Sequence, residues 1–235
     1  MRRWLRRFGW EPFVPPFYWS ATHLLRFLLL LLARWEVRGR EHVPREGPLI
    51  VVSNHLSNAD PPILAAAVLY RRIRYMAKAE LFRFPIGVVM RLYGAFPVRR
   101  FEADARALLA AERILRHGGA LGMFPEGHRS RTGYVGKPRP GTALIALRTG
   151  APVLPCAIEG TEQLRNPLAV FRRPRIAVTI GQPFRLEQVK RPTEGDVSEA
   201  TQRIFGAITA LLPAKYLGPY TGSEAPHDGS DPPRD

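Results

Sequence analysis

The sequence predicts an α/β fold: a mixed, mainly parallel sheet covered by helices, with an N-terminal interfacial membrane helix. Two observations predict the sheet. Short β-rich runs alternate with helical patterns from residue 35 onward, and some runs, such as "LIVV" at 49–52, are apolar at every position. Alternating strands and helices are typical of βαβ units, whose strands are buried on both faces. A leucine-rich stretch at 24–33 predicts the additional helix.

Each predicted strand is a short run of β-branched, aromatic or other apolar residues. In chain order these runs are Trp35–Arg38, Leu49–Ser53, Ile73–Ala77, Ala95–Val98, Ala120–Phe124, Val153–Ile158 and Arg175–Ile180. Helical patterns lie at Pro61–Tyr70, Glu80–Leu92, Ala103–Arg116, Thr142–Thr149 and Ser198–Leu212. Gly118 and Gly150 follow two of these patterns, where a left-handed residue commonly ends a helix.

The N-terminal segment, residues 1–36, is expected to associate with a membrane without crossing it. A spanning helix needs about 20 apolar residues, whereas the uninterrupted run from Phe27 to Ala33 is short and follows His23 and Arg26. A cleaved signal peptide is disfavoured because no small-residue cleavage site follows the run. We expect the folded domain over residues 37–216 and a disordered tail over 217–235, which has few apolar residues and many Gly and Pro.

The charge balance points to a polyanionic partner. The chain of 235 residues carries a formal net charge of +15, which suits nucleic acid, anionic lipid or a phosphorylated substrate. No recognised nucleic-acid-binding motif is present, so nucleic acid is not the expected partner. The single cysteine, Cys156, excludes an intrachain disulfide and is expected to be a buried small residue.

Three polar loops are expected at the carboxyl edge of the sheet, where ligands of such folds bind. "SNHLSNAD" at 53–60 contains His55 and Asp60, "PVRRF" at 97–101 contains Arg100, and "FPEGHRSRTG" at 124–133 contains Glu126 to Arg129. Asp60 could cap the helix that two prolines begin. It could instead, or as well, orient His55 as a general base, if the chain turns between the two residues.

The absence of other catalytic motifs limits the reactions that the sequence can support. No G-x-S-x-G nucleophile elbow, clustered metal ligands or complete P-loop is found. The simplest scheme therefore has His55 activate a hydroxyl of the substrate itself, for attack on an acyl group that is already activated. Arginines at positions 100 and 129 suit an anionic acceptor, because the guanidinium group can bind phosphate through two hydrogen bonds.

Four segments resemble, in order and spacing, the motifs of the glycerolipid acyltransferase family, whose members include the 1-acylglycerol-3-phosphate acyltransferases. They are "NHLSNAD" at 54–60, "GAFPVRR" at 94–100, "FPEGHRSR" at 124–131 and "APVLPCAI" at 151–158. The resemblance implies that His55 is the general base and Asp60 its partner. It places Arg100, Glu126, Gly127 and Arg129 at the acceptor site. Two departures, His128 and Arg99, lie beside that site and bear on the acceptor rather than on the reaction.

By this resemblance the protein transfers a fatty acyl group from acyl-CoA or acyl carrier protein to a lysophospholipid, 1-acylglycerol 3-phosphate above all, in phospholipid biosynthesis. Glycerol 3-phosphate or a lyso-aminolipid is an alternative acceptor. A basic nucleic-acid-binding protein is the alternative from another class. No cofactor or metal is expected. The protein is expected to be peripheral or monotopic on the cytoplasmic face of the cell membrane, in contact with anionic lipids.

Overall fold

A computed structural model describes residues 14–98 and 105–218, and within these ranges the strands form one seven-stranded sheet in the order β1-β7-β6-β2-β5-β3-β4. The strands are β1 Arg34–Arg38, β2 Leu49–Ser53, β3 Ile73–Lys78, β4 Phe96–Val98, β5 Ala120–Met123, β6 Val153–Glu159 and β7 Arg175–Ile180. All neighbouring pairs are parallel except β6 and β7, which are antiparallel. The mixed, mainly parallel α/β sheet predicted from the sequence is therefore confirmed.

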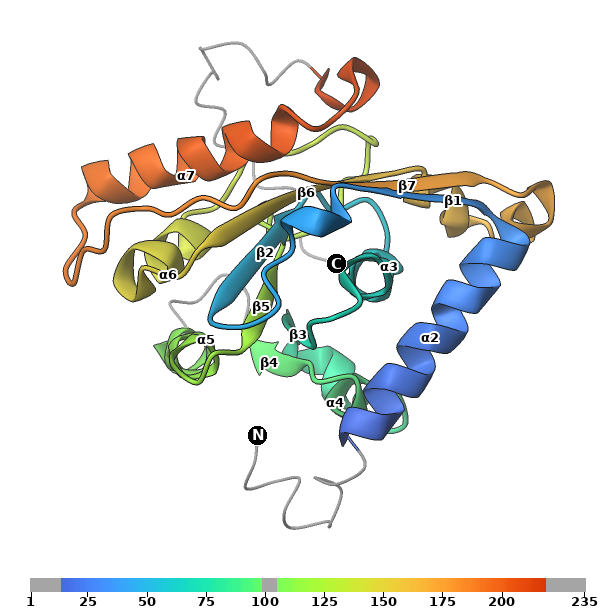
Figure 1. Cartoon of the computed structure of the whole chain (residues 1–235), viewed down its shortest axis with the longest axis horizontal. Coiled ribbons are helices and arrows are strands. Elements are labelled where there is room, and N and C mark those ends of the chain that lie inside the picture. Colours follow the sequence, from blue (N-terminus) through green and yellow to red (C-terminus); the bar gives the residue numbers. More distant parts are fainter. Residues whose placement is uncertain (1–13, 99–104, 219–235) are drawn as a thin grey trace.

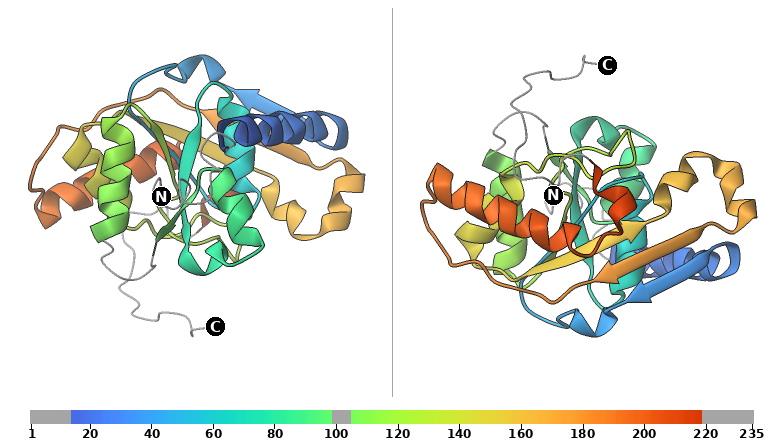
Figure 2. Two further views of the ribbon diagram at one scale, coloured as in Figure 1. Left: turned by 90° about the horizontal axis from the view of Figure 1, so that it is seen from below. Right: turned by 90° about the horizontal axis from the view of Figure 1, so that it is seen from above.

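Helices cover both faces of the sheet (Figure 1). Three of them, α5 (Ala105–Arg116), α6 (Gly141–Thr149) and α7 (Glu194–Thr209), pack on one face, and α2 (Val14–Leu32) and α3 (Asp60–Val68) pack on the other. Helix α4 (Ile86–Leu92) lies beside α2, and Figure 2 shows the same layers from below and above. Short 3-10 turns are η2 Arg40–His42, η3 Ala79–Phe82, η4 Thr161–Arg165, η5 Pro167–Arg172 and η6 Ala214–Tyr216.

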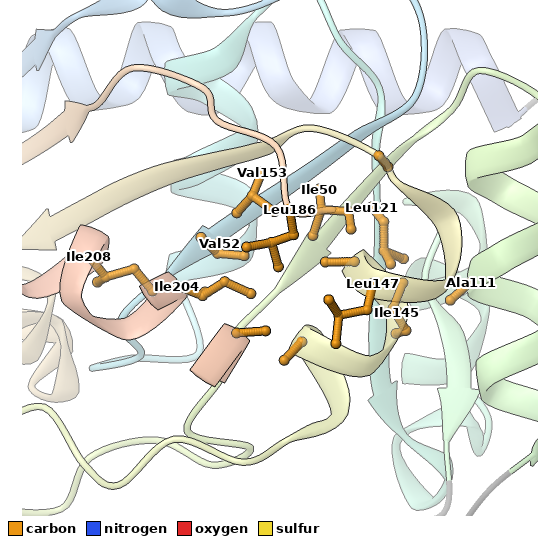
Figure 3. Packing of buried hydrophobic residues seen from close by; sticks show 14 of the residues in the cluster. Ile50, Val52, Ala111, Leu121, Ile145, Leu147, Val153, Leu186, Ile204 and Ile208 are labelled. Atoms are coloured by element: carbon orange, nitrogen blue, oxygen red, sulfur yellow. The ribbon is translucent and has the colours of Figure 1, made fainter. Parts of the chain in front are cut away.

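The central strand β2 is buried on both sides, as its apolar run predicted. Ile50 and Val52 point into the cluster beneath α5, α6 and α7, where they meet Ile145 and Ile204 (Figure 3). The alternate β2 residues contribute to the opposite cluster beneath α2 and α3. Cys156 lies there fully buried, and burial raises the pKa of its thiol, as expected for a small core residue. This double burial holds β2 rigidly, so the loop that follows it begins from a fixed point.

Helix α2 packs on the domain through a face that includes polar side chains, and its opposite face exposes large apolar side chains. Tyr18 is fully buried and accepts a hydrogen bond from the Ile73 backbone N–H, while the buried Thr22 hydroxyl bonds with the Tyr93 hydroxyl. Thr22 therefore points into the protein, although the sequence favours a polar, solvated face made of Thr22, His23 and Arg26. No helix among the described residues is long and apolar enough to cross a membrane. The predicted boundary after residue 36 falls inside β1.

Two predicted helices differ clearly from the structure. The pattern at 80–92 is not one helix, because Pro85 separates the short turn η3 from α4. Helix α7 begins at Glu194 rather than Ser198, because Thr193 and Asp196 form a capping box that starts it earlier. The turns η4 and η5 were not predicted. The predicted disordered tail lies outside the described residues from position 219 onward.

Candidate active site

The loop after β2 is fastened to the neighbouring strand β6 by Asn54. Its side-chain amide donates to the carbonyl oxygen of Ile158 at 2.9 Å, and its side-chain oxygen accepts the Ile158 backbone N–H at 2.8 Å. Both residues are buried, so these bonds satisfy backbone groups where the β2–β6 ladder ends. The next residue, His55, is thereby placed at the carboxyl edge of the sheet.

His55 and Asp60 meet because the loop turns back on itself. The His55 Nδ1 atom lies 2.8 Å from the Asp60 Oδ2 atom. The same oxygen accepts the backbone N–H groups of Leu56 at 2.6 Å and Ser57 at 2.7 Å. The other carboxylate oxygen accepts the Thr161 hydroxyl at 2.6 Å. Asp60 is fully buried, so these four donors together stabilise its position.

The carboxylate of Asp60 does not cap α3. Asp60 is the first residue of that helix, with Ala59 at the cap position, and no side chain accepts a hydrogen bond from the first turn there. Its carboxylate points back into the preceding loop instead. The interpretation of Asp60 as only a helix cap is therefore wrong, whereas a proline at the helix start is present as predicted.

The pair is arranged for proton transfer at one nitrogen of His55. Because the Asp60 carboxylate accepts at Nδ1, the ring proton is held there and Nε2 is left as the basic nitrogen. Asp60 also stabilises the positive charge that forms on the ring when Nε2 takes a proton. His55 is 8% exposed, and one face of its ring lies against Phe124.

The loop after β5 holds the backbone of His55 on two sides. Glu126 is 1% exposed, and its Oε1 accepts the His55 backbone N–H at 2.8 Å while its Oε2 accepts that of Gly136 at 2.9 Å. Ser130 donates its backbone N–H to the His55 carbonyl oxygen at 2.7 Å. Burial raises the pKa of Glu126 from its ordinary 4.5 to about 7, with a smaller contribution from the Asp60 charge, although the two N–H donors oppose the shift.

The outer part of this loop carries exposed cationic and polar groups. Gly127 has a φ of +75°, and an added Cβ would lie 2.7 Å from the Arg139 side chain, so glycine is required there. His128 and Arg129 follow it and are both exposed. Glu126 is thus buried inside the protein, whereas Arg129, three positions later in the same loop, faces solvent.

Comparison with protein-family models identifies residues 34–159, which include His55, Asp60 and Glu126, as a match to the family described as Acyltransferase. The chain belongs to the Acyltransferase family. It is similar to the 1-acyl-sn-glycerol-3-phosphate acyltransferase of Bacillus subtilis, at 28% identity over 71% of this chain and 82% of that protein. The enzyme of the same name from Streptococcus pneumoniae is 29% identical over 78% of this chain and 69% of that protein.

A solved structure supports the same assignment. The 1-acyl-sn-glycerophosphate acyltransferase of Thermotoga maritima matches with a TM-score of 0.60 and 26% identity, over 91% of this chain and 85% of that one. Some relatives are longer: a chloroplastic 1-acyl-sn-glycerol-3-phosphate acyltransferase from Brassica napus is 31% identical, but only 42% of it is covered. The resemblance drawn from the four motifs is therefore confirmed, and the protein is an acyltransferase of this family.

The structure of the acyltransferase brings together some of the predicted site residues. His55, Asp60 and Glu126 are joined through direct hydrogen bonds. Gly127 and Arg129 lie on the same loop as Glu126, beyond its buried part. Arg100 lies outside the described residues, as does Arg99.

Three residues of the acyltransferase site were missed by the sequence analysis. Thr161, fully buried, follows β6 and bonds Asp60 across 101 positions of the chain. Asn54 holds the loop after β2 in place, and the backbone N–H of Gly136 binds Glu126 in the loop after β5, through the hydrogen bonds described above. Thr161 could have been found from the sequence, because a hydroxyl residue just after a parallel strand is expected at the same sheet edge as His55.

Proposed function

We propose that this acyltransferase transfers a fatty acyl group from acyl-CoA or acyl carrier protein to the free hydroxyl of 1-acylglycerol 3-phosphate. The observation that carries the proposal is the buried His55–Asp60 pair, whose basic Nε2 atom has no need of a protein nucleophile or metal to activate a hydroxyl. The similar Bacillus and Streptococcus enzymes, both named 1-acyl-sn-glycerol-3-phosphate acyltransferase, support this acceptor.

In the proposed reaction, Nε2 of His55 removes the proton of the acceptor hydroxyl as its oxygen attacks the thioester carbonyl carbon. A C–O bond forms, the C–S bond breaks, and the proton passes from His55 to the leaving thiolate. Asp60 stabilises the transient imidazolium and keeps the Nδ1 proton in place. The hydrogen bonds from Leu56, Ser57 and Thr161 hold the Asp60 carboxylate at that distance.

We assign acceptor binding to the exposed end of the β5 loop. Arg129 and Arg100 are proposed to bind the acceptor phosphate, and Gly127 lets the backbone approach it. Glu126, which the sequence analysis placed among the acceptor-binding residues, is proposed to position His55, because backbone N–H groups already occupy both of its oxygens. In this assignment the Glu126 carboxylate does not contact the acceptor phosphate.

We also propose that the enzyme is peripheral or monotopic on the cytoplasmic face of the cell membrane. The outward side of α2 exposes Leu24, Phe27 and Leu31 at 59%, 61% and 57%, and Phe84, beside the neighbouring α4, is 88% exposed. Large apolar side chains on adjacent elements are typical of an interfacial surface. The net charge of +15 favours anionic lipids.

The test is a substrate panel with the purified full chain. Acyl-CoA and acyl carrier protein donors are each combined with 1-acylglycerol 3-phosphate, glycerol 3-phosphate and a lyso-aminolipid, and products are read by mass spectrometry. The proposal expects diacylglycerol 3-phosphate as the main product. Acylation of another acceptor alone would assign the alternative substrate. Nucleic-acid binding with no acyl product from any pair would favour the alternative of a basic binding protein.

A further inference from the structure

The catalytic histidine is one end of a stack of three rings. The His55 and Phe124 rings have centroids 4.1 Å apart and planes 19° apart, and the Phe124 and Tyr75 rings follow at 6.1 Å and 15°. Three segments far apart in the sequence supply these rings: the loop after β2, the end of β5 and strand β3. The hydrogen bonds to Asp60 described above involve neither Phe124 nor Tyr75, so the stack is a separate contact to His55.

The sheet is adapted to this stack at Gly122. A Cβ added to this β5 residue would clash with the ring of Tyr75 and with the side chain of Ile73, so the Tyr75 ring can occupy its place only because position 122 has no side chain. Tyr75 is 4% exposed, and its hydroxyl has no hydrogen-bond partner among the described residues. An unpaired buried hydroxyl costs stability. The contact that Tyr75 makes with the stack therefore comes from its ring and not from its hydroxyl.

Asp60 alone does not fix the orientation of the His55 ring. A hydrogen bond at Nδ1 sets the distance of one ring atom, but the ring plane can still tilt about that bond. A flat aromatic surface against one face removes this freedom and aims Nε2 in one direction. The negative face of the aromatic ring also stabilises a cation stacked on it, as His55 becomes when it takes the proton.

We propose that Phe124 is a positioning residue for His55, which fixes the plane of the imidazole ring and stabilises its protonated form, with Tyr75 as the backing ring. This inference rests on the proposed function, in which His55 is the general base. A phenylalanine that only filled the core would affect stability, whereas a positioning residue affects the chemical step.

The test compares Phe124→Leu with Phe124→Tyr, which keeps the ring. Phe124→Leu should lower kcat about tenfold or more, since a slightly misplaced catalytic group can cost up to about 10²-fold. KM for both substrates should stay unchanged, and Phe124→Tyr should restore most of kcat. Phe124→Met replaces Phe124→Leu if the latter does not fold. Phe205→Leu is the matched control, because it removes a partly buried aromatic ring from α7, outside the stack, and it should leave kcat unchanged.

A spectroscopic arm needs no substrate and separates this inference from the proposed function. In protein labelled with ¹³C at histidine Cε1, the His55 signal, assigned by its loss in His55→Gln, should be shifted upfield by the Phe124 ring current. Phe124→Tyr should keep that shift and Phe124→Leu should abolish it. The proposal is overturned if Phe124→Leu leaves both the shift and kcat unchanged, or if it raises KM while kcat is preserved. If the wild type shows the shift but transfers no acyl group, the proposed function fails while the ring contact stands.

Discussion

Replacing Glu126 by glutamine tests how the loop after β5 is joined to the loop after β2. In the wild type both carboxylate oxygens accept, one from the His55 backbone N–H and one from that of Gly136. Glutamine has one oxygen and one NH₂ group, so one of these buried donors would face another donor. Leaving a buried N–H unsatisfied costs about 1–3 kcal/mol. At low pH Glu126 is protonated, but its hydroxyl oxygen can still accept a hydrogen bond, whereas the glutamine NH₂ group cannot, so Glu126→Gln should lower the free energy of unfolding by this amount.

The cost should shrink as the pH rises. The pKa of Glu126 is raised from 4.5 to about 7 in the folded protein, so between these values the folded state binds more protons than the unfolded state. The contribution of Glu126 to wild-type stability must therefore decrease with rising pH in this window, and a shift of this size corresponds to about 3 kcal/mol at most. Glutamine does not titrate, so the variant should lack this decrease and approach or exceed the wild type at pH 8.

Urea unfolding followed by tryptophan fluorescence at pH 5, 6, 7 and 8 measures this difference. The exposed Glu187→Gln is the matched control and should follow the wild type at each pH. Kinetics adds a second readout: Glu126→Gln should lower kcat with little change in the acceptor KM, because Glu126 supports His55 and does not bind the phosphate. A constant destabilisation at every pH, or a large rise in acceptor KM alone, would refute this reasoning.

Three further changes address the other contacts. Thr161→Val should lower the free energy of unfolding by about 1–3 kcal/mol and reduce kcat, because it removes a hydrogen bond to a buried carboxylate; unchanged urea midpoint and kcat would contradict this. Arg129→Ala should raise the acceptor KM about tenfold or more without altering the donor KM, whereas Arg113→Ala should change neither. Phe27→Ser with Leu31→Ser should weaken sedimentation with anionic vesicles at least about tenfold, and unaltered binding would exclude α2 as the membrane contact.

Most of the fold could be predicted because its signals are local. Strand β2 is apolar at each position, and Gly150 has the left-handed conformation that ends α6, so each is readable within a few residues. The error at 80–92 came from giving the apolar periodicity more weight than Pro85. The antiparallel pairing of β6 with β7 could not be predicted, because it depends on the path of the intervening η4 and η5 turns.

The same distinction holds at the active site. His55 and Asp60 are five positions apart, so a turn within one loop was enough to predict their contact. Thr161 and Gly136 reach the site only through the strand order, which places the ends of β6 and β5 on either side of β2. The acceptor-binding role of Glu126 was predicted from the resemblance of its motif to the family. Its burial and its two backbone donors, which need the three-dimensional arrangement, point to positioning instead.

The most direct test of the central claim is acceptor-dependent thiol release by wild-type protein and by His55→Ala. With acyl-CoA and 1-acylglycerol 3-phosphate, the wild type should release free CoA in step with the formation of diacylglycerol 3-phosphate. His55→Ala should fold normally by circular dichroism, because the ring is the only part removed, yet lose about 10²–10⁴-fold in rate, as expected for the loss of a general base. Wild-type turnover by folded His55→Ala would contradict the account.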